Sequence, residues 1–300
     1  MNGTMPHIVQ YQGSKRKLAP QILRYMPYKF KRCIEPFAGS AAITIAVAAI
    51  KDVDEFIVND LNAPLIGMLR EAVENPDRLY EAYQHVWDEQ FTMDSTEHFL
   101  QVREAFNAGA ETPENMLYLL ARCVKGSVRY NNEGKINQSC DKRRHGTKPE
   151  TVYKNMLAVS GLLRGRTEFY SRDYREIFEM AEQGDIVYMD PPYQGTSTNR
   201  DSRYLAGLSY EEFAESLKVL NDKQVDYLIS YDGNCGGKSY GQDLPEELGL
   251  TKLLLNAGRS TQATLLGRDD VTYEALYVSA GLKRFVDSMP MQESLWEEAG

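Results

Sequence analysis

The residues best suited to chemistry in this 300-residue chain are Asp190-Pro191-Pro192-Tyr193, which directly follow an apolar run at 185–189. Ligand sites in open α/β sheets lie beyond the carboxyl ends of the strands, and these four residues would lie there. Prolines fix φ and carry no backbone donor, so the carbonyls of this segment are left to accept hydrogen bonds from a ligand. A carboxylate, a rigid carbonyl and an aromatic face together suit a planar amine.

Such a site would also activate the amine. The lone pair of an exocyclic amine is delocalised into its ring, which makes the nitrogen a poor nucleophile. Two acceptors that hold both N–H groups favour a pyramidal nitrogen and stabilise the positive charge that develops during attack. The structural alternative is a Pro-Pro turn that only caps a strand.

A second segment, Glu35-Pro36-Phe37-Ala38-Gly39-Ser40-Ala41, joins a short apolar run to an alanine-rich stretch that ends at Ile50. A turn of small residues at a helix N-terminus lets a cofactor approach the backbone. Asp60 stands 21 positions after Gly39, at the end of the next predicted strand, where a carboxylate can accept from both hydroxyls of a ribose. The further glycines of an NAD-binding loop are absent, and an ordinary structural turn is an equal alternative.

A third segment, Tyr11-Gln12-Gly13-Ser14-Lys15-Arg16-Lys17, lies upstream of the first predicted strand. Its Gly-Ser-Lys sequence superficially resembles a phosphate-binding loop. A true P-loop follows a strand and reads GxxxxGK[ST], so ATP hydrolysis is not expected here. The simple alternative is a basic N-terminal arm.

The elements that must position these segments alternate between strand and helix. Parallel strands are expected at 33–35, 55–60, 167–170, 185–189 and 226–230, helices at 41–50, 61–73 and 209–221, and antiparallel segments at 251–256 and 271–279. This order predicts a doubly wound α/β sheet. Residues 76–165 interrupt it with helical periodicity and no run typical of a buried strand. Within them, Asn-Asn-Glu-Gly at 131–134 is typical of a turn and indicates a hairpin or loop.

Charge is distributed unevenly along a chain whose net charge is −9. Residues 1–34 hold seven Lys/Arg and no acid, and residues 122–175 hold thirteen Lys/Arg against five Asp/Glu. This asymmetry is typical of a phosphate-facing surface on an acidic protein, although a basic stretch alone is more often a solvated face.

Composition excludes several other classes of protein. No apolar run approaches the roughly 18 residues that span a bilayer, and the N-terminus has no signal-peptide core. The cysteines at 33, 123, 140 and 235 form no CxxC pair. This spacing argues against a zinc site or a disulfide framework and favours a reducing cytoplasm.

The order of YQGSK, EPFAGS, a helical insert, SRDY and DPPY resembles that of the Dam-like (alpha-group) DNA adenine-N6 methyltransferases, over residues 8 to 280. The resemblance implies the Rossmann-like fold of class I S-adenosylmethionine-dependent methyltransferases. It implies a catalytic domain at 1–75 plus 166–300 and an inserted, mostly helical target-recognition domain at 76–165. The implied reaction transfers methyl from S-adenosylmethionine to the N6 amine of a flipped adenine in double-stranded DNA, with S-adenosylhomocysteine as product and no metal.

Placed on this sequence, the resemblance implies three sets of site residues. The target adenine would be held by Asp190, Pro191, Pro192 and Tyr193. The cofactor would be bound by Tyr11, Gly13, Ser14, Lys15, Glu35, Phe37, Gly39, Ser40, Asp60, Asp173, Tyr174 and Asp190, with Lys15 facing the methionine carboxylate, Asp60 the ribose, and Asp173 and Tyr174 the adenine. DNA would be contacted by Arg122, Lys125, Arg129, Tyr130, Asn131, Asn137, Lys142, Arg143 and Arg144.

Two positions depart from the family pattern. Ala41 stands where many relatives have a second glycine, which puts the shape of the cofactor loop in question. Ile136 replaces the usual Phe of the recognition hairpin, which puts the hairpin contacts in question.

Alternatives to this function remain at the level of the sequence. One is a methyltransferase that acts on an amine of RNA or on a protein glutamine, although the related tetrapeptides for those substrates more often begin with Asn. The other is a catalytically inactive DNA-binding module. The expected partners are double-stranded DNA and, optionally, a cognate restriction enzyme, for a cytoplasmic monomer or weak dimer of bacterial, archaeal or phage origin.

Overall fold

The computed structural model describes residues 5–126, 128–192, 208–235, 238–239, 242–259 and 271–288. Two residues predicted to be functional are affected: Tyr193 and the side chain of Lys125 lie outside the described part. The described strands are β1 (Lys29–Glu35), β2 (Asp52–Asn59), β3 (Thr167–Tyr170), β4 (Asp185–Met189), β5 (Asp226–Cys235), β6 (Lys238–Ser239), β7 (Thr251–Arg259) and β8 (Val271–Val278).

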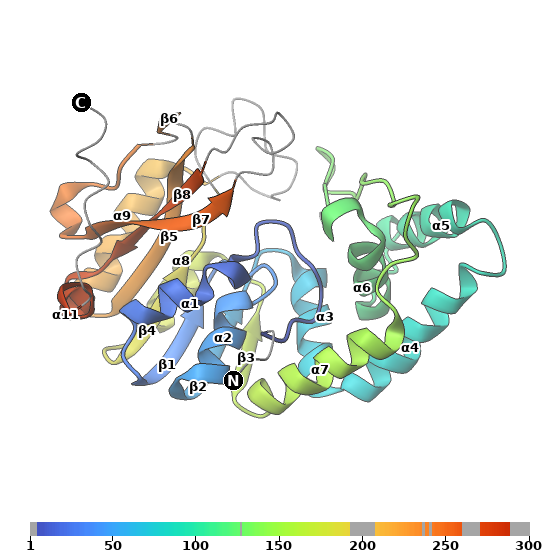
Figure 1. The fold of residues 1–300 in the computed structure, drawn as a ribbon, viewed down its shortest axis with the longest axis horizontal. Helices are drawn as coiled ribbons and strands as arrows, with labels where there is room; N and C mark the ends of the chain where they lie inside the picture. The colour runs from blue at the N-terminus through green and yellow to red at the C-terminus, as the bar shows by residue number, and fades with distance from the viewer. Residues whose placement is uncertain are drawn as a thin grey trace.

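These strands form one mixed sheet in the order β3-β2-β1-β4-β5-β8-β7, with β6 paired to β5 (Figure 1). Strands β1 to β5 pair in parallel, and β8 lies antiparallel between β5 and β7. The predicted α/β sheet is therefore confirmed. The chain runs outward from β1 to β3 on one side and from β4 to β7 on the other, so the strand order reverses between β1 and β4. Open α/β sheets bind ligands at such a reversal.

Strand β1 begins earlier than its apolar run indicated. Its first residues, Lys29 to Arg32, alternate basic side chains with the buried Phe30, and only the end of the strand is buried continuously. A search for apolar runs finds that end and misses the start, because the first residues face solvent on one side.

The sheet has a hydrophobic core on each face. One core takes Cys33, Phe56 and Tyr188 from the strands and packs them under α1 (Ala19–Ile22), α2 (Ala42–Ile50) and α3 (Ala63–Glu74). The other takes Ile34 and Val187, which are sequence neighbours of Cys33 and Tyr188, and packs them under α8 (Tyr174–Met180) and α9 (Tyr210–Asp222). Neighbouring residues of a strand point to opposite faces, which is why one apolar run serves both cores.

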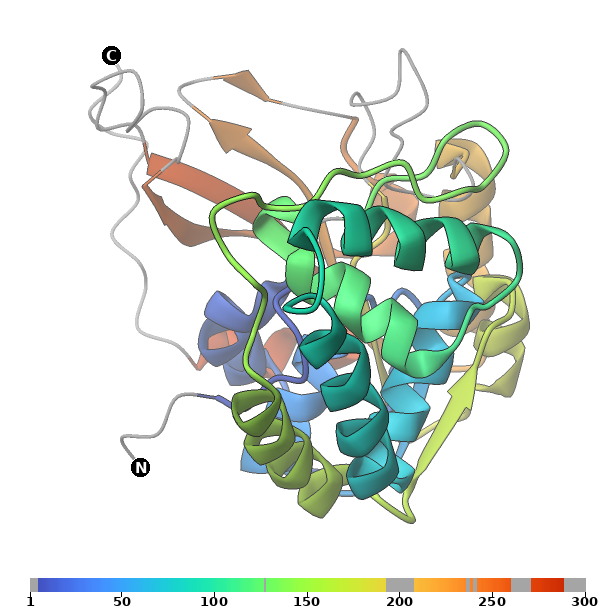
Figure 2. The same cartoon turned by 90° about the vertical axis from the view of Figure 1, so that its right-hand side faces the viewer.

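The insert forms a helical lobe beside the sheet (Figures 1 and 2). Its helices are α4 (Pro76–Glu89), α5 (Ser95–Asn107), α6 (Pro113–Arg122) and α7 (Pro149–Leu163). Helices α6 and α7 pack against α3, so the lobe shares a core with the sheet domain. The lobe begins at Pro76 and the sheet resumes at Thr167, close to the predicted boundaries; the division into two functional domains stays a prediction.

The remaining described helical turns are short. They are η1 (Lys15–Lys17), η2 (Leu23–Tyr25), η3 (Val124–Gly126), η4 (Glu246–Leu248), η5 (Ala280–Leu282) and α11 (Lys283–Asp287). No helix in the described ranges is long and apolar enough to cross a membrane. The thiols of Cys33, Cys123 and Cys140 are free and buried.

The turn predicted at 131–134 is the tip of a small hairpin on the lobe. Tyr130 and Ile136 form an antiparallel bridge. The Asn131 amide donates to the Lys135 carbonyl at 2.8 Å, and the Asn137 amide donates to the Arg129 carbonyl at 2.9 Å. Gly134 has φ +75°, a conformation that glycine adopts without steric cost.

Candidate active site

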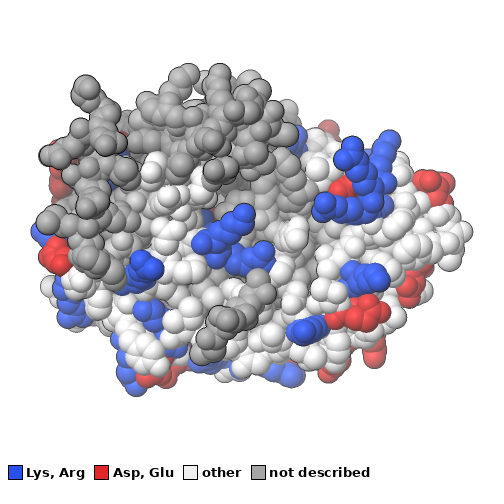
Figure 3. Space-filling view, viewed as in Figure 1, with Lys and Arg blue, Asp and Glu red and all other residues white. Residues whose placement is uncertain are grey.

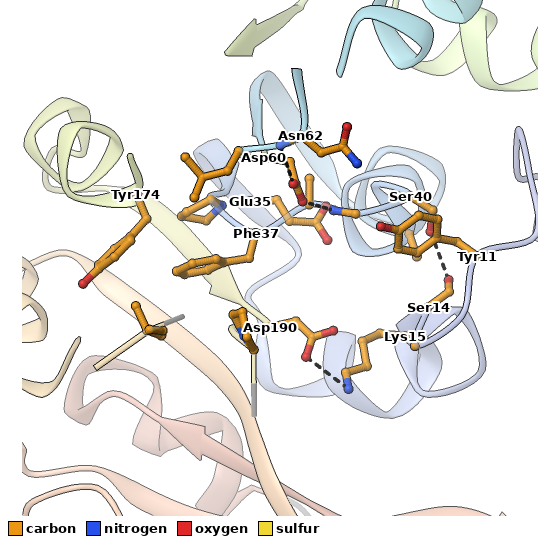
Figure 4. A pocket seen from close by; sticks show the side chains of 18 of the residues that line it. Tyr11, Ser14, Lys15, Glu35, Phe37, Ser40, Asp60, Asn62, Tyr174 and Asp190 are labelled. Atoms are coloured by element: carbon orange, nitrogen blue, oxygen red, sulfur yellow. Dashed lines mark hydrogen bonds and ion pairs between the residues drawn. The ribbon is translucent and has the colours of Figure 1, made fainter. Parts of the chain in front are cut away.

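An open cavity lies beyond the carboxyl ends of β1, β2 and β4, where the strand order reverses (Figure 4). The three segments with predicted chemistry meet here, although they are far apart in the sequence. Every residue predicted to bind a cofactor lines this cavity: Tyr11, Gly13, Ser14, Lys15, Glu35, Phe37, Gly39, Ser40, Asp60, Asp173, Tyr174 and Asp190. Pro192 lines it as well.

The loop after β1 brings backbone close to the cavity. Gly39 has φ +50°, and a Cβ at this position would lie 3.2 Å from the Tyr11 ring. The Ser40 hydroxyl donates to that of Ser14 at 3.2 Å, which joins this loop to the N-terminal segment. Ala41 adopts the left-handed conformation at φ 54°. Alanine thus adopts here a conformation that glycine adopts without steric cost, at a cost of about 1 kcal/mol.

Asp60 is fixed at the end of β2 by two backbone amides. One carboxylate oxygen accepts from the Gly39 amide at 2.9 Å, and the other accepts from the Asn62 amide at 3.0 Å. Each oxygen has a second lone pair with which it can accept a ligand hydroxyl. Burial raises the pKa of the Asp60 carboxyl, and the two amides oppose that shift.

Aromatic side chains form one wall of the cavity. The rings of Phe37 and Tyr174 lie 5.1 Å apart between centroids, and Tyr174 also contacts Phe178 and Phe213 at 5.3 and 5.9 Å. Asp173 caps α8 by accepting from the Arg175 amide, and its carboxylate also pairs with the Arg175 guanidinium. These contacts hold an apolar wall against which a flat heteroaromatic ring can pack.

Lys15 and Asp190 line the cavity, and a third charged side chain, Glu274 of β8, pairs with Lys15. The Lys15 ammonium is 3.1 Å from Asp190 Oδ1 and 2.8 Å from Glu274 Oε1. Burial alone would lower the pKa of Lys15, but the two carboxylates raise it above its usual value. Lys15 therefore pairs with two carboxylates of the protein, and its contact with the methionine carboxylate of the cofactor stays a prediction. Glu274 was not predicted to be a site residue. The sequence feature that could have indicated it is an acidic residue within an otherwise hydrophobic strand.

Glu35 is a buried carboxyl group at the end of β1. One of its oxygens accepts from both the amide and the hydroxyl of Thr44, at 2.9 and 2.6 Å. Burial raises the pKa of Glu35 to about 7, against the opposing effect of these hydrogen bonds. A group that titrates near neutral pH therefore lines the cavity.

The chain matches the family model for D12 class N6 adenine-specific DNA methyltransferases over residues 11–255. It belongs to this family. It is therefore an adenine-specific DNA methyltransferase, and membership implies S-adenosylmethionine as the methyl donor. The alternatives of an RNA or protein substrate, or of an inactive binding module, find no support in the comparisons.

Named relatives agree with this assignment. The type II methyltransferase M1.LlaDCHI of Lactococcus lactis subsp. cremoris is 29% identical over 74% of this chain and 79% of its own. The DNA adenine methylase of Haemophilus influenzae is 26% identical over 74% of this chain and 78% of its own. The DNA N-6-adenine-methyltransferase of Escherichia phage P1 is 29% identical over 72% of this chain, which spans only 28% of that longer protein.

Arg122 of this methyltransferase, predicted to contact a DNA phosphate, is buried inside the helical lobe. The side chain is 1% exposed, and its guanidinium donates to the carbonyls of Ser95, Asp141 and Arg144. The prediction of a phosphate contact is wrong for this residue, because its charge is enclosed in the lobe.

Tyr130, also predicted to contact DNA, is buried between the hairpin and the sheet domain. It is 8% exposed, and its hydroxyl accepts from the Asn62 side chain at 2.6 Å. Asn62 in turn caps α3 and lines the cavity. Tyr130 therefore anchors the hairpin to the sheet domain, which corrects its prediction as a direct DNA contact.

The other residues predicted to contact DNA are exposed on the lobe: Arg129, Asn131, Asn137, Lys142, Arg143 and Arg144. Lys and Arg side chains gather at the upper end of the lobe, toward the region between lobe and sheet (Figure 3). No cluster of His, Cys, Asp or Glu that could hold a metal occurs in the described part of this methyltransferase.

Stability should depend on pH through Glu35. The pKa of Glu35 is about 7 in the folded state and near 4.3 in the unfolded state, so the folded state favours the protonated form. The stabilisation that Glu35 contributes to folding is therefore fully present below the unfolded pKa and is lost as the pH rises through 7. We expect the free energy of unfolding to fall by roughly 2–3 kcal/mol between pH 5 and 8 in the wild type and by less in Glu35→Gln. Urea denaturation without cofactor measures this, and the same pH dependence in both proteins would contradict it.

Proposed function

We propose that this methyltransferase binds S-adenosylmethionine in the cavity and receives a flipped adenine at Asp190, in double-stranded DNA that lies across the helical lobe. The observation that carries the proposal is the meeting of three separate segments around one cavity, at the reversal of strand order. No metal is part of the proposal.

The cavity lining fits the parts of the cofactor. Asp60 would accept from the ribose hydroxyls, because its carboxylate is already fixed by Gly39 and Asn62. Phe37 and Tyr174 would pack against the adenine ring, with Asp173 at its edge. Tyr11, Gly13, Ser14, Glu35, Gly39 and Ser40 would surround the methionine end. Bound there, the cofactor supplies an electrophilic methyl group.

The target amine would be held by Asp190 and the carbonyl of Pro191. A carboxylate cannot reach N6 inside a duplex, so the base must leave the stack, at a cost of a few kcal/mol. Pro192 lines the cavity beside Asp190, and Tyr193 would stack on the base. Two acceptors then favour attack by the nitrogen, without a covalent enzyme intermediate. Most of the rate enhancement would come from positioning and electrostatics.

The lobe would position the DNA. Lys125, Lys142, Arg143 and Arg144 are proposed to contact phosphates, which fix the register of the protein on the duplex. Arg129, Asn131 and Asn137 on the hairpin are proposed to read base edges, where each good bidentate pair contributes roughly 1–3 kcal/mol of discrimination. We further propose that the enzyme acts as a monomer or weak dimer. The type II name of the Lactococcus relative supports a cognate restriction enzyme as an optional partner.

The decisive experiment is transfer of labelled methyl from S-adenosylmethionine to unmethylated genomic DNA, followed by nucleoside analysis and mapping of modified sites. We expect N6-methyladenine at one short motif and no label in RNA or protein. Cofactor binding without any methyladenine would contradict the proposed substrate, and absence of cofactor binding would contradict the proposed cavity.

A further inference from the structure

Glu274 is an acidic residue on the core-facing side of a strand. It lies on β8 in the same alternating set as Leu276 and Val278, which are both 0% exposed. The Glu274 side chain is itself only 14% exposed. A buried carboxylate is unfavourable unless it is paired, so this position needs a specific partner.

That partner is Lys15, which Glu274 shares with the proposed catalytic carboxylate. The Lys15 ammonium is 2.8 Å from Glu274 and 3.1 Å from Asp190, and its side chain is 8% exposed. Lys15 points from the N-terminal segment toward Asp190 in Figure 4. Three elements that are distant in the sequence thus place two negative charges and one positive charge around the site of the reaction.

The strands around this group of charges hold a buried hydrogen bond and an irregular strand pairing. Tyr188 on β4 hydrogen-bonds to Ser230 on β5 at 2.7 Å, and both residues are 0% exposed. The register between β5 and β8 shifts between Tyr231 and Asn234, near the position of Glu274. Such irregularities are common beside active sites, where they redirect side chains. Asp190 also interacts electrostatically with the buried Glu35 carboxyl group and contributes to raising its pKa.

We propose that Glu274 is a positioning residue for methyl transfer: by sharing Lys15, it leaves an excess negative charge at Asp190 where the amine becomes positive. This inference rests on the proposed role of Asp190. If Lys15 paired with Asp190 alone, the two would form a neutral pair. With Glu274 present, the group of three carries a net charge of −1, and Lys15 still fixes the orientation of Asp190. A preorganised charge of this kind stabilises the developing cation.

The test compares Glu274→Gln with the wild type in single-turnover methyl transfer to unmethylated genomic DNA. We expect the rate to fall by about tenfold or more, while the Kd for S-adenosylhomocysteine changes by less than about threefold. Loss of a nearby like charge makes Asp190 harder to protonate, so the acidic limb of the pH–rate profile should move to lower pH. A purely structural role of Glu274 would not move this limb.

Two further variants complete the test. Asp243→Asn is the matched control, because it also removes a carboxylate paired with a lysine beside β7 and β8, away from the cavity. It should keep the wild-type rate and acidic limb. Glu274→Asp keeps the negative charge, so it should be faster than Glu274→Gln and retain the wild-type acidic limb; it also serves if the Gln variant does not fold.

The outcomes separate this inference from the proposed function. An inactive Asp190→Ala variant together with wild-type rates in Glu274→Gln would overturn the role of Glu274 alone. An unshifted acidic limb in a slow but folded Glu274→Gln, or an acidic limb displaced in Glu274→Asp, would also overturn it. Full activity of Asp190→Ala would instead overturn the proposed function.

Discussion

Replacement of Asp190 by alanine is expected to lower the rate of methyl transfer by about 10³-fold or more and to leave cofactor binding nearly unchanged. Asp190 is the proposed acceptor for the N6 amine, so its loss removes the interaction that strengthens as positive charge develops. Lys15 keeps Glu274 as a partner at 2.8 Å, and the cavity should therefore stay intact in the variant.

The measurements are single-turnover methyl transfer and titration with S-adenosylhomocysteine. A lower single-turnover rate without a change in cofactor Kd identifies an interaction made in the transition state. Asp243→Asn controls for the loss of a carboxylate elsewhere in the same domain. Turnover by Asp190→Ala within tenfold of the wild type would exclude Asp190 as the acceptor.

The second large effect is on stability. Replacement of Arg122 by methionine should lower the free energy of unfolding by about 3 kcal/mol, because hydrogen bonds from a charged donor to buried carbonyls contribute roughly 1.5–3 kcal/mol each. The guanidinium joins the start of α5 to the segment around Asp141, with donors 3.2 Å from the Ser95 carbonyl and 2.9 Å from the Asp141 carbonyl. Its removal deletes these hydrogen bonds, and the Asp141 carbonyl keeps only the Arg144 amide, at 3.4 Å. Urea denaturation followed by circular dichroism measures the loss.

Arg143→Ala is the matched control for this experiment, because Arg143 is an exposed arginine of the same segment. It should leave stability unchanged within about 0.5 kcal/mol and lower the slope of log K against log salt for DNA binding by about 0.9. Folded Arg122→Met should keep the wild-type slope. The opposite pattern, with the salt slope changed only in Arg122→Met, would show that Arg122 contacts a phosphate after all.

The order of motifs along the chain was enough to predict the sheet and the location of the cavity. Apolar runs that end in Glu35, Asp60 and Asp190 mark strands whose carboxyl ends must meet at one edge of a parallel sheet. The Phe37–Gly39 turn and the Asp173–Tyr174 pair are likewise local features, each next to a strand or at the start of a helix. Side chains attached to such landmarks are positioned by the fold itself, so their convergence could be predicted from the order of the motifs.

The partners and the burial of charged and polar side chains could not be predicted in the same way. Arg122 and Arg143 look alike in the sequence, but one is enclosed by three carbonyls and the other is exposed. Tyr130 stands in a hairpin motif, but its hydroxyl accepts from Asn62 of the sheet domain. Glu274 pairs with Lys15 from the opposite end of the chain. Burial and pairing of a charge depend on long-range packing, and neither residue type nor spacing in the sequence encodes which partner will be within reach.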